Sequence, residues 1–560
     1  MTSHRCSRLS LVRIDLLVLS VAATCAVGAH AADTVKPTLN LNAPSPGATT
    51  TGTSTSMNGN VSDDVGVSRV DWRNDRGGSG SASFRAGSRL SLWTVDAVAL
   101  QTGTNNLTVT AYDAAGNATQ KTVTVTRSAT TPPPPPPPAP PPPAPAPPPS
   151  SGYSCTDANV LCVDDTAGAT QRYATIQAAA SAAKPGNVVL VHSGNYAGFT
   201  VSTSGTATQP IRFIANASDV VINRGGNSEY DGVRLNNVSY VQIEGFTIRN
   251  DSTSSPRINR CISARGATPT SPMHGNVVRN NTCTLANAEG VYLSQFADGL
   301  VEGNTISRAG QNGQARMHGL YLANAGSNNT TIRGNRIFDN KNAEGNGIHA
   351  NGDLSIGGSG LIRNVVIEGN TIYGNGQSGI NMDGVQDSTL QNNLVYGNAR
   401  HAIRDYQIDA AAGAARLRIV NNTLVATGGW AVKLSEDAGG HVIFNNILAG
   451  SSGSLSVGTT TGLVSNSNVV TSVFSYDNES TTVSLSTWRS KTGQDGATQS
   501  STTSALFTNP SAGDYTLSTG SVARNKGVAT LNGVSAPPKD IVGTARPQAG
   551  AIDIGAYEMK

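Results

Sequence analysis

One short phrase recurs along the middle of the chain, as Gly290-Val291-Tyr292-Leu293, Gly319-Leu320-Tyr321-Leu322 and Gly347-Ile348-His349-Ala350. Each copy has a small residue, an aliphatic residue and then a polar or aromatic one, which is the alternation of a short β-strand. The small residue recurs at Gly232, Cys261, Gly290, Gly319, Gly347, Gly379, Ala402 and Ala431, in steps of 29, 29, 29, 28, 32, 23 and 29 residues. A strand repeated at such a period predicts a solenoid in which each repeat forms one coil.

A second phrase follows in most repeats and places Gly-Asn or Asn-Asn between two aliphatic runs, as in Glu302-Gly303-Asn304-Thr305-Ile306. Both residue types tolerate left-handed backbone angles, so we predict a tight bend, and stacked coils would align the asparagines in a ladder. The two phrases together resemble the right-handed parallel β-helix of the pectate-lyase-like superfamily, over about half of the chain. The resemblance implies an all-β fold but not one activity, because this superfamily includes lyases, hydrolases, epimerases and adhesins.

Composition divides the chain into regions. We expect a signal peptide at 1–31, an immunoglobulin-like β-sandwich at 32–127, a Pro-rich linker at 128–152, a right-handed parallel β-helix at 153–465, and C-terminal coils with a cap at 466–560. A short amphipathic helix at 173–183 is expected to cover the first coil. The phrases at 61–67 and 111–117 resemble bacterial immunoglobulin-like modules. Within them, Asp63 and Asp64 are interpreted as acids of a turn.

The N-terminus and the cysteines both indicate export. Three arginines precede an apolar run at 16–27, and Ala29-His30-Ala31 fits a signal-peptidase site. The run is too short to span a bilayer. We therefore predict a secreted protein, extracellular or periplasmic, with no membrane association after the signal is removed. Cys155 and Cys162 are the expected disulfide, and the pairing of Cys261 with Cys283 stays open.

Net charge and sequence motifs limit the classes of ligand and cofactor that the protein is expected to bind. A net charge of +3 lacks the basicity of nucleic-acid binders and is compatible with an acidic polysaccharide. The calcium cluster of pectate lyases and the Asp-Pro-His motif of epimerases are absent from the sequence. Asp353 and Asp383 are the nearest approach to the paired aspartates of polygalacturonases. We predict no metal and no cofactor, with calcium left as an option without a convincing site, and we expect a monomer.

The repeat aligns side chains into columns, because stacked strands lie about 4.8 Å apart and alternate residues face outward. Two positions after the small residue the column reads Arg234, Ser263, Tyr292, Tyr321, His349, Asn381, Arg404 and Lys433. Two positions further it reads Asn236, Arg265, Ser294, Ala323, Asn351, Asp383, Tyr406 and Ser435. One position before the small residue it reads Asp231, Arg260, Glu289, His318, Asn346, Ser378, His401 and Trp430. Histidine, tyrosine and arginine gather in the middle coils, which predicts a site there; His274 is a more doubtful member.

These residue types suit β-elimination of a uronate glycan, which needs a base, an acid and a group that neutralises the carboxylate. His349 is the expected base and Tyr321 the expected acid, or the two exchange roles, while Arg404 with Asn381 holds the carboxylate. We assign catalysis to His349, Tyr321, His318 and Arg404, and substrate binding to Tyr292, Asn351, Asn381, Asp383, Tyr406 and Lys433. The predicted function is a secreted polysaccharide lyase.

Three alternatives remain open on the same scaffold. A C5-epimerase would use the same proton abstraction without cleaving the chain. A glycoside hydrolase would need two carboxylates about 5 to 9.5 Å apart. A surface adhesin would bind a glycan without turning it over.

Overall fold

The structure is a computed structural model that describes residues 33–50, 52–84, 90–128, 152–164, 173–548 and 550–560. The predicted signal peptide and nearly all of the predicted linker lie outside these residues. The chain forms two compact units, Met1–Pro135 and Pro136–Lys560, each of which is described by itself. No helix of the described segments has the length and apolar character needed to cross a membrane.

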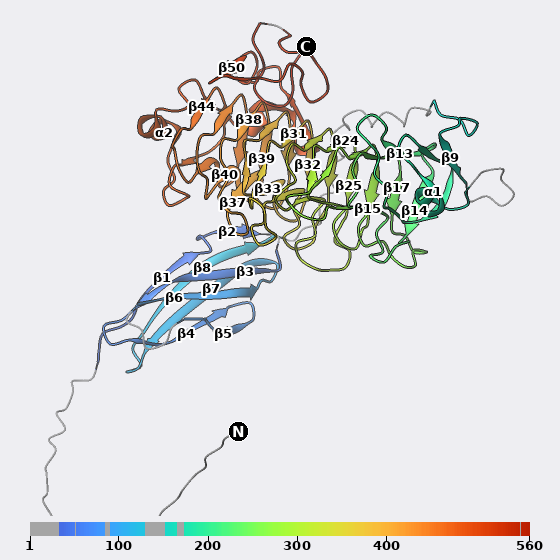
Figure 1. Cartoon of the computed structure of the whole chain (residues 1–560). Helices are drawn as coiled ribbons and strands as arrows, with labels where there is room; N and C mark the ends of the chain where they lie inside the picture. The colour runs from blue at the N-terminus through green and yellow to red at the C-terminus, as the bar shows by residue number, and fades with distance from the viewer. Residues whose placement is uncertain (1–32, 51, 85–89, 129–151, 165–172, 549) are drawn as a thin grey trace, which may run out of the picture. The chain divides into compact units, whose positions relative to one another are not determined.

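The first unit is a small β-sandwich, coloured blue in Figure 1. One sheet holds β1 (Thr38–Ala43), β3 (Ser54–Ser62) and β6 (Leu90–Ala99), and the other holds β2 (Ala48–Thr50), β8 (Ala118–Arg127), β7 (Gly103–Asp113), β4 (Val67–Asn74) and β5 (Ser79–Ser81). Alternate residues point inward, so Val61, Trp93 and Val109 are fully buried between the sheets. This confirms the immunoglobulin-like module predicted from the alternating runs and turns.

The second unit is a parallel β-helix, as predicted, in which each coil contributes one strand to each of three sheets (Figure 1). Sheet I contains β9 (Val160–Val163), β10 (Val188–Val191), β13 (Ile211–Ala215), β16 (Val241–Glu244), β20 (Val277–Arg279), β24 (Leu300–Glu302), β27 (Thr331–Arg333), β31 (Val366–Glu368), β35 (Thr389–Gln391), β38 (Arg418–Val420), β41 (Val442–Phe444) and β44 (Val464–Asn466). Sheet II contains β11 (Gly194–Ala197), β14 (Val220–Arg224), β17 (Thr247–Arg249), β21 (Thr282–Thr284), β25 (Thr305–Ser307), β28 (Arg336–Phe338), β32 (Thr371–Tyr373), β36 (Leu394–Tyr396), β39 (Thr423–Ala426), β42 (Ile447–Gly450), β45 (Val469–Val470) and β47 (Gln499–Ser500). Sheet III contains β12 (Phe199–Val201), β15 (Val233–Asn236), β18 (Ile262–Arg265), β22 (Val291–Ser294), β26 (Leu320–Ala323), β29 (Ile348–Asn351), β33 (Ile380–Asp383), β37 (Ile403–Tyr406), β40 (Trp430–Leu434), β43 (Gly453–Val457) and β46 (Phe474–Ser475).

Sheet III carries the predicted columns without a slip. Tyr292 pairs with Tyr321, Tyr321 with His349, His349 with Asn381, Asn381 with Arg404, and Arg404 with Lys433. The aliphatic partner of each phrase points into the core, where residues such as Leu320, Ile348 and Ile380 are fully buried. The polar residue between two inward ones therefore has to face outward.

Buried asparagines form the ladder predicted from the Gly-Asn and Asn-Asn phrases, at the bend between sheets I and II. It runs through Asn281, Asn304, Asn335, Asn370, Asn393, Asn422, Asn446 and Asn468, and each Nδ2 donates to the next Oδ1 over 2.9–3.1 Å. The residue before each bend supplies the turn: Gly369 has φ 62° and Asn392 φ 54°. The ladder satisfies polar groups that the bend would otherwise leave buried and unpaired.

Replacing Asn370 with alanine should destabilise the solenoid by about 3–5 kcal/mol, because several buried groups lose their partner at once. Both the backbone N–H and Nδ2 of Asn335 donate to Asn370 Oδ1, and Asn370 Nδ2 donates to the carbonyl of Ile332. The midpoint of urea unfolding measures the loss. Asn312→Ala, in an exposed turn of the same unit, is the control and should shift the midpoint little. Equal shifts in the two variants would contradict a structural role for the ladder.

Helices cover both ends of the solenoid. Helix α1 (Ile176–Ala182) begins at its N-cap Thr175 and packs Ile176, Ala179 and Ala180 against the first coil, as predicted. It is shorter than the predicted 173–183, because Tyr173 instead forms a β-bridge with Val163. At the other end, α2 (Leu485–Thr492) places Trp488 against Phe474 with ring centroids 4.9 Å apart.

The last residues run along the side of the coils. Small elements here are α3 (Thr503–Leu506), a 3₁₀ helix (Pro510–Ala512), and the pairs β48 (Phe507–Asn509) with β49 (Asp514–Leu517) and β50 (Thr530–Leu531) with β51 (Val534–Ser535). Asn421 Nδ2 donates to the carbonyls of Asp553 and Gly555, and Asn445 Nδ2 to that of Val528. The segment therefore covers the outward-facing asparagines of the bends.

Two disulfides form in the second unit. Cys155 is bonded to Cys162, as predicted, and Cys261 is bonded to Cys283, the pair that the sequence left open. Cys283 occupies a position on β21 that is isoleucine on the neighbouring coils, so the second disulfide lies inside the core. The two disulfides are consistent with an oxidising, extracytoplasmic compartment.

Candidate active site

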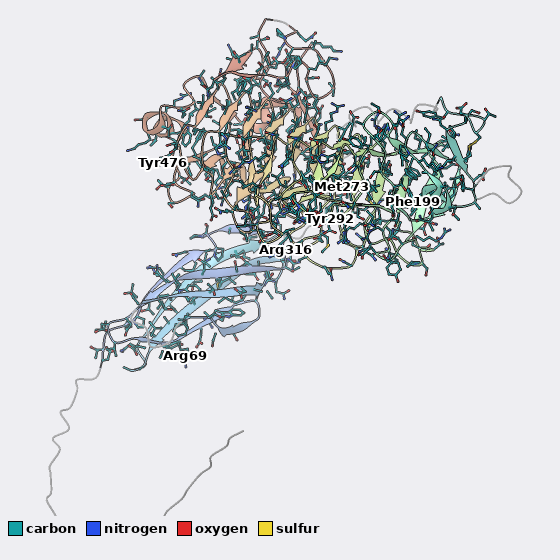
Figure 2. The ribbon with its side chains drawn as sticks, viewed as in Figure 1. Arg69, Phe199, Met273, Tyr292, Arg316 and Tyr476 are labelled. Carbon is teal, nitrogen blue, oxygen red and sulfur yellow. A yellow bond between two sulfur atoms is a disulfide. The ribbon has the colours of Figure 1, made fainter. Side chains whose placement is uncertain are left out.

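A groove of about 480 Å³ lies on the outer face of sheet III, over β26, β29, β33 and β37. Its lining consists of Arg316, His318, Tyr321, Glu344, Asn346, His349, Asn351, Gln377, Asn381, Arg400, Arg404, Tyr406, Ile408 and Asp409. All four residues assigned to catalysis from the sequence are in this set, with three of the six assigned to substrate binding. Figure 2 labels Arg316, from the loop ahead of β26, and Tyr292, from the preceding coil.

The centre of the groove is a cluster of aromatic rings. His318 and His349 stack with centroids 4.5 Å apart, and Tyr321 meets them edge-on at 5.3 and 4.8 Å. His318 and His349 are only 5% and 6% exposed. His318 lies two positions ahead of β26, and His349 is on the next strand, β29, which brings the two rings together. The two imidazoles thus form a desolvated pair behind the tyrosine.

His318 is a neutral imidazole with a defined tautomer. The backbone N–H of Asn346 donates to its Nδ1 at 3.1 Å, so the ring proton is on Nε2. Burial, then the neighbouring His349 and Arg316, hold the pKa of His318 well below its usual 6.5. In this state the Nε2–H is a hydrogen-bond donor.

His349 is also neutral. Burial and the Arg404 guanidinium lower the pKa of His349 to about 3. The Nδ2 atom of Asn381 lies 2.9 Å from His349 Nδ1, while Asn381 Oδ1 is buried without a hydrogen-bond partner. The amide of Asn381 is therefore placed to determine which nitrogen of His349 carries the proton.

The tyrosines of the groove remain protonated. Burial raises the pKa of Tyr321 far above its usual 10, and burial together with Asp383 raises that of Tyr406 to about 12. Asn351 Nδ2 donates to the Tyr321 oxygen at 3.2 Å, and Asn381 Nδ2 donates to that of Tyr406 at 3.3 Å. Since both oxygens already accept a hydrogen bond, each hydroxyl proton remains available for donation.

Arg404 differs from two other cations near the groove, Arg316 and Lys433; Arg400, which also lines the groove, likewise has no ion pair in the described segments. Arg316 pairs with Glu344 at 2.6 Å, and Lys433 with Glu479 at 2.6 Å. Within the described segments, the guanidinium of Arg404 has neither an ion pair nor a hydrogen bond, and its Cζ lies 4.6 Å above the Tyr406 ring. An arginine held in place with unused donors fits a planar anion such as a carboxylate.

Three predicted substrate-binding residues are outside the groove lining. Tyr292 lies one coil away, edge-on to Tyr321 at 5.5 Å and beneath Arg260 and Arg265. Lys433 is one coil beyond Arg404. Asp383 is fully buried, and its Oδ2 accepts from the N–H groups of Ile408 and Asp409, so it holds a loop of the groove. The doubtful His274 also lies elsewhere, on β19 (Met273–His274), which pairs with β23 (Phe296–Ala297), and it is paired with Asp298.

Seven lining residues had no assigned role. Asn346 was in one of the predicted columns, and six were in none of them: Arg316, Glu344, Gln377, Arg400, Ile408 and Asp409. The first four of these six precede the small residue of a phrase by two or three positions. Columns drawn at those two positions of the repeat would have included them. Ile408 and Asp409 follow β37 in a loop that lies outside the repeated phrases. Asp409 Oδ2 accepts from Asn351 at 3.2 Å, and the Asp409 carbonyl accepts from the N–H of Leu354. This loop contact brings Asp409 to the groove.

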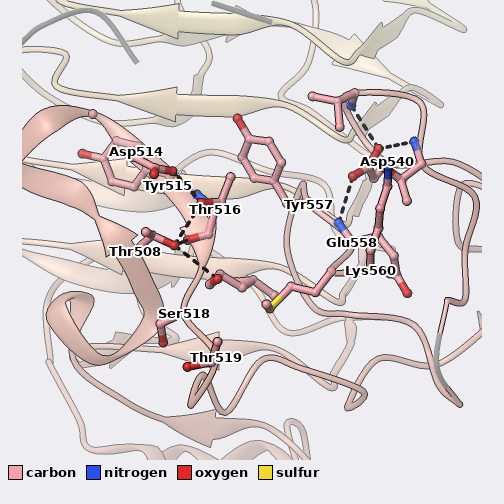
Figure 3. A pocket seen from close by; sticks show the side chains of 15 residues that line it. Thr508, Asp514, Tyr515, Thr516, Ser518, Thr519, Asp540, Tyr557, Glu558 and Lys560 are labelled. Atoms are coloured by element: carbon pink, nitrogen blue, oxygen red, sulfur yellow. Dashed lines mark hydrogen bonds between the residues drawn. The ribbon is translucent and has the colours of Figure 1, made fainter. Parts of the chain in front are cut away.

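A larger cavity of about 760 Å³ lies among the C-terminal segments (Figure 3). Its lining includes Tyr515, Tyr557, Asp540 and Thr508. The Asp540 carboxylate accepts hydrogen bonds from the backbone N–H groups of Val542, Thr544 and Glu558, as the dashed lines show. The Asp540 carboxylate therefore has a structural role, and no histidine lines the cavity. The groove on sheet III is therefore the better candidate for chemistry.

A carboxyl group lies in the core beneath the groove. Asp405 is fully buried and occupies the interior column between Met382 and Leu434. Its Oδ1 accepts from the N–H of Ser435 at 2.7 Å. Burial, reinforced by Asp437, raises the pKa of Asp405 from 3.8 to about 8. The folded protein therefore keeps this group protonated at pH values where the unfolded chain ionises it.

This shift predicts a loss of stability in alkali. The contribution of Asp405 is complete below about pH 4 and is lost as the pH rises through about 8. Asp405→Asn cannot ionise, so its melting temperature should fall several degrees less than that of the wild type between pH 5 and pH 9. Asp387→Asn is the control, because Arg416 and Arg363 hold the pKa of Asp387 at about 2 and it stays ionised throughout. Parallel melting curves for wild type and Asp405→Asn would contradict the prediction.

The described residues contain two clusters of three possible metal ligands, and neither is in the groove. One consists of Cys155, Cys162 and His192, in which both sulfurs are in a disulfide. The other consists of Asp33, Asp63 and Asp64 in the immunoglobulin-like module.

Solved structures with similar folds have different activities. The A-module of a mannuronan C-5 epimerase from Azotobacter vinelandii is 16% identical, with 58% of this chain and 93% of that one covered and a TM-score of 0.32. A family 28 exopolygalacturonase from Yersinia enterocolitica is 12% identical, with 78% and 95% covered and a TM-score of 0.28. A PL6 family alginate lyase is 13% identical, with 68% and 60% covered and a TM-score of 0.30. Similarity at this level concerns the fold alone.

Family models assign both units. The bacterial Ig domain model matches residues 37–109. The model of the right handed beta helix region matches residues 189–356 and 344–474, which together span just over half of the chain. No curated protein matches the sequence. The chain belongs to the right-handed β-helix family, with a bacterial immunoglobulin-like domain ahead of the helix.

Proposed function

We propose that the groove on sheet III cleaves an acidic, uronate-containing polysaccharide by β-elimination. The observation that carries the proposal is the guanidinium of Arg404, which has no ion pair in the described segments and lines the same groove as the neutral His349 and the protonated Tyr321. These are the three functions that elimination needs: a charge partner for the carboxylate, a proton acceptor and a proton donor.

The reaction begins with binding of the substrate carboxylate to Arg404. A bidentate pair neutralises the carboxylate and makes the adjacent C5–H more acidic, because the negative charge that develops there spreads onto the carboxylate oxygens. The same pair also acts on His349. Arg404 is the charge that depresses the pKa of His349 beyond the effect of burial, so its neutralisation by substrate makes the imidazole a stronger base.

His349 then removes the C5 proton. For this role the Asn381 amide turns over, so that its Oδ1, which has no partner here, accepts from Nδ1–H of His349, and Nδ2 no longer donates to Tyr406. The ring then offers the lone pair of Nε2 as a base. Asn381 is in this scheme a positioning residue, and it lies on the coil next to His349. His318, whose Nε2–H is a donor, assists by hydrogen bonding within the groove.

Tyr321 protonates the leaving oxygen. Its raised pKa keeps the proton in place until transfer, and the Asn351 amide orients the hydroxyl. The C–O bond of the glycosidic link breaks as the C4=C5 double bond forms, so the electron pair of the C5–H bond ends in the new double bond. Burial of the phenol excludes water that would compete for the site.

A hydrolytic function is less well supported by the carboxylates. Asp383 is buried under the loop that it holds, and Asp353 accepts hydrogen bonds from Ser355 in an exposed turn outside the groove lining. Glu344 pairs with Arg316. The pair of free, facing acids that hydrolysis requires is thus not assembled from the two aspartates considered from the sequence.

The test is incubation of the secreted chain with a panel of acidic polysaccharides, followed by ultraviolet absorbance and size-exclusion chromatography. Rising absorbance of the unsaturated uronate with shortened chains is the expected result. Shortened chains without absorbance would overturn the proposal in favour of hydrolysis, and inverted sugars without shortening in favour of a C5-epimerase. Retained binding with no change in the glycan would identify an adhesin.

A further inference from the structure

Three carboxylates converge at one end of the immunoglobulin-like module. Oxygens of Asp33, Asp63 and Asp64 all lie within 4.8 Å of one another. Asp33 precedes β1, and the other two residues are in the turn between β3 and β4. In the described part of the module, no lysine or arginine forms an ion pair with them, and Arg69 pairs with Asp71 instead. Negative charge therefore accumulates here without a protein cation to offset it.

Asp63 is the buried member of the group, with 7% of its surface exposed. Its Oδ1 accepts from the N–H groups of Val65 at 3.1 Å and Gly66 at 2.8 Å, which is the turn expected from the sequence. Its Oδ2 is buried and has no hydrogen-bond partner. Burying a carboxylate oxygen without a donor or a counter-ion costs free energy, so the state of this atom is evidence for a cationic ligand.

The turn between β7 and β8 holds the Asp33 segment in place. Asn117 Nδ2 donates to the carbonyl of Asp33 at 2.9 Å and to Oδ2 of Asp113 at 2.7 Å. The backbone N–H of Asn117 donates to Asp113 Oδ1 at 2.9 Å. This turn anchors the segment before β1, and the Asp33 carboxylate lies close to those of Asp63 and Asp64, so two parts of the chain distant in sequence contribute oxygens to one point.

We propose that Asp33, Asp63 and Asp64 bind a calcium ion. The cluster presents only oxygen, the donor that hard cations prefer, and carboxylates in one- or two-oxygen modes with waters supply the 6–8 ligands of Ca²⁺. Magnesium demands a stricter octahedron and retains its waters, so it fits an open, three-carboxylate cluster less well. The ion satisfies the buried Oδ2 of Asp63 and ties the segment before β1 to the β3–β4 turn.

The experiment is calorimetric titration of the full secreted chain, freed of metal with a chelator, with CaCl₂. A dissociation constant of roughly 0.1–1 mM is expected, as for extracellular modules. Asp64→Asn tests the site without disturbing the fold, because Asp64 is exposed, and Asp63→Asn removes the buried charge. Asp96→Asn, on the exposed side of β6, changes the charge of the same module equally and is the control.

Calcium at 10 mM should raise the unfolding transition of the module by roughly 5–10 °C in wild type and Asp96→Asn. Asp64→Asn should bind at least tenfold more weakly and lose most of that shift. No calcium binding in the wild type, or equal binding in wild type and Asp64→Asn, would overturn the proposal. Equal affinity for Mg²⁺ would overturn the assignment to calcium. Activity of the groove is not the readout, so the result is independent of the proposed lyase reaction.

Discussion

His349→Ala is expected to lower kcat/KM on the acidic glycan about 10²–10⁴-fold, the usual contribution of a positioned base. Tyr321→Phe should cause a loss of similar size, because it removes the hydroxyl that protonates the leaving oxygen and keeps the ring against His318 and His349. Initial rates of absorbance increase by the unsaturated product measure both. The two losses should not add in the double variant, since base and acid act in one step.

Matched replacements distinguish chemistry from loss of fold. His274→Ala removes a half-buried histidine outside the groove, and Tyr292→Phe removes the hydroxyl next to Tyr321 in the same column. Both should retain nearly full activity, and all four variants should keep the melting temperature of the solenoid within a few degrees. Full activity in His349→Ala and Tyr321→Phe would contradict the proposed roles.

Arg404→Ala is expected to lower kcat about 10²–10³-fold and to raise KM, because the carboxylate loses both its binding partner and the charge that stabilises the transition state. Arg404→Lys should recover only part of the loss, since a lysine cannot pair in a bidentate manner. Arg404→Ala should also raise the pKa of His349, because the Arg404 charge lowers it. Histidine NMR titration measures that change without substrate.

A carboxyl-reduced glycan provides an independent test of Arg404. Because the reduced glycan has no carboxylate to accept the charge that develops at C5, it is compared by binding and not by turnover. The wild type should bind it as weakly as Arg404→Ala binds the native glycan, and Arg404→Ala should lose little more affinity for the reduced one. Arg316→Ala is the control, because the Arg316 guanidinium is already paired with Glu344. An equal loss on native and reduced glycan in Arg404→Ala would show that this arginine does not bind the carboxylate.

Much of the site was readable from the repeat. The column through Tyr321, His349, Asn381 and Arg404 depends only on the position of each residue relative to the small residue of its phrase. Hydrogen bonding between parallel strands keeps neighbouring phrases aligned, so a column in the sequence becomes a row on the surface. The asparagine ladder at the bends follows for the same reason.

Two features of the groove could not be predicted from the repeat: the residues that a loop contributes and the burial of Asp383. Ile408 and Asp409 reach the groove through a loop outside the repeated phrases, and both of their N–H groups donate to the buried carboxylate of Asp383. The sequence placed Asp383 among the substrate-binding residues because its strand position faces outward. Only the loop packed over it shows why it is fully buried.

The sequence by itself determined the solenoid, the bends and the outward columns, because these follow from strand alternation and repeat spacing. The tertiary structure alone decided the electrostatics. His349 would titrate near neutrality on an open strand, and it is neutral here because overlying loops and neighbouring rings remove water from it. The meeting of Asp33 with Asp63 likewise depends on how distant segments pack. Desolvation and long-range contacts are properties of the folded chain, and no local pattern of residues encodes them.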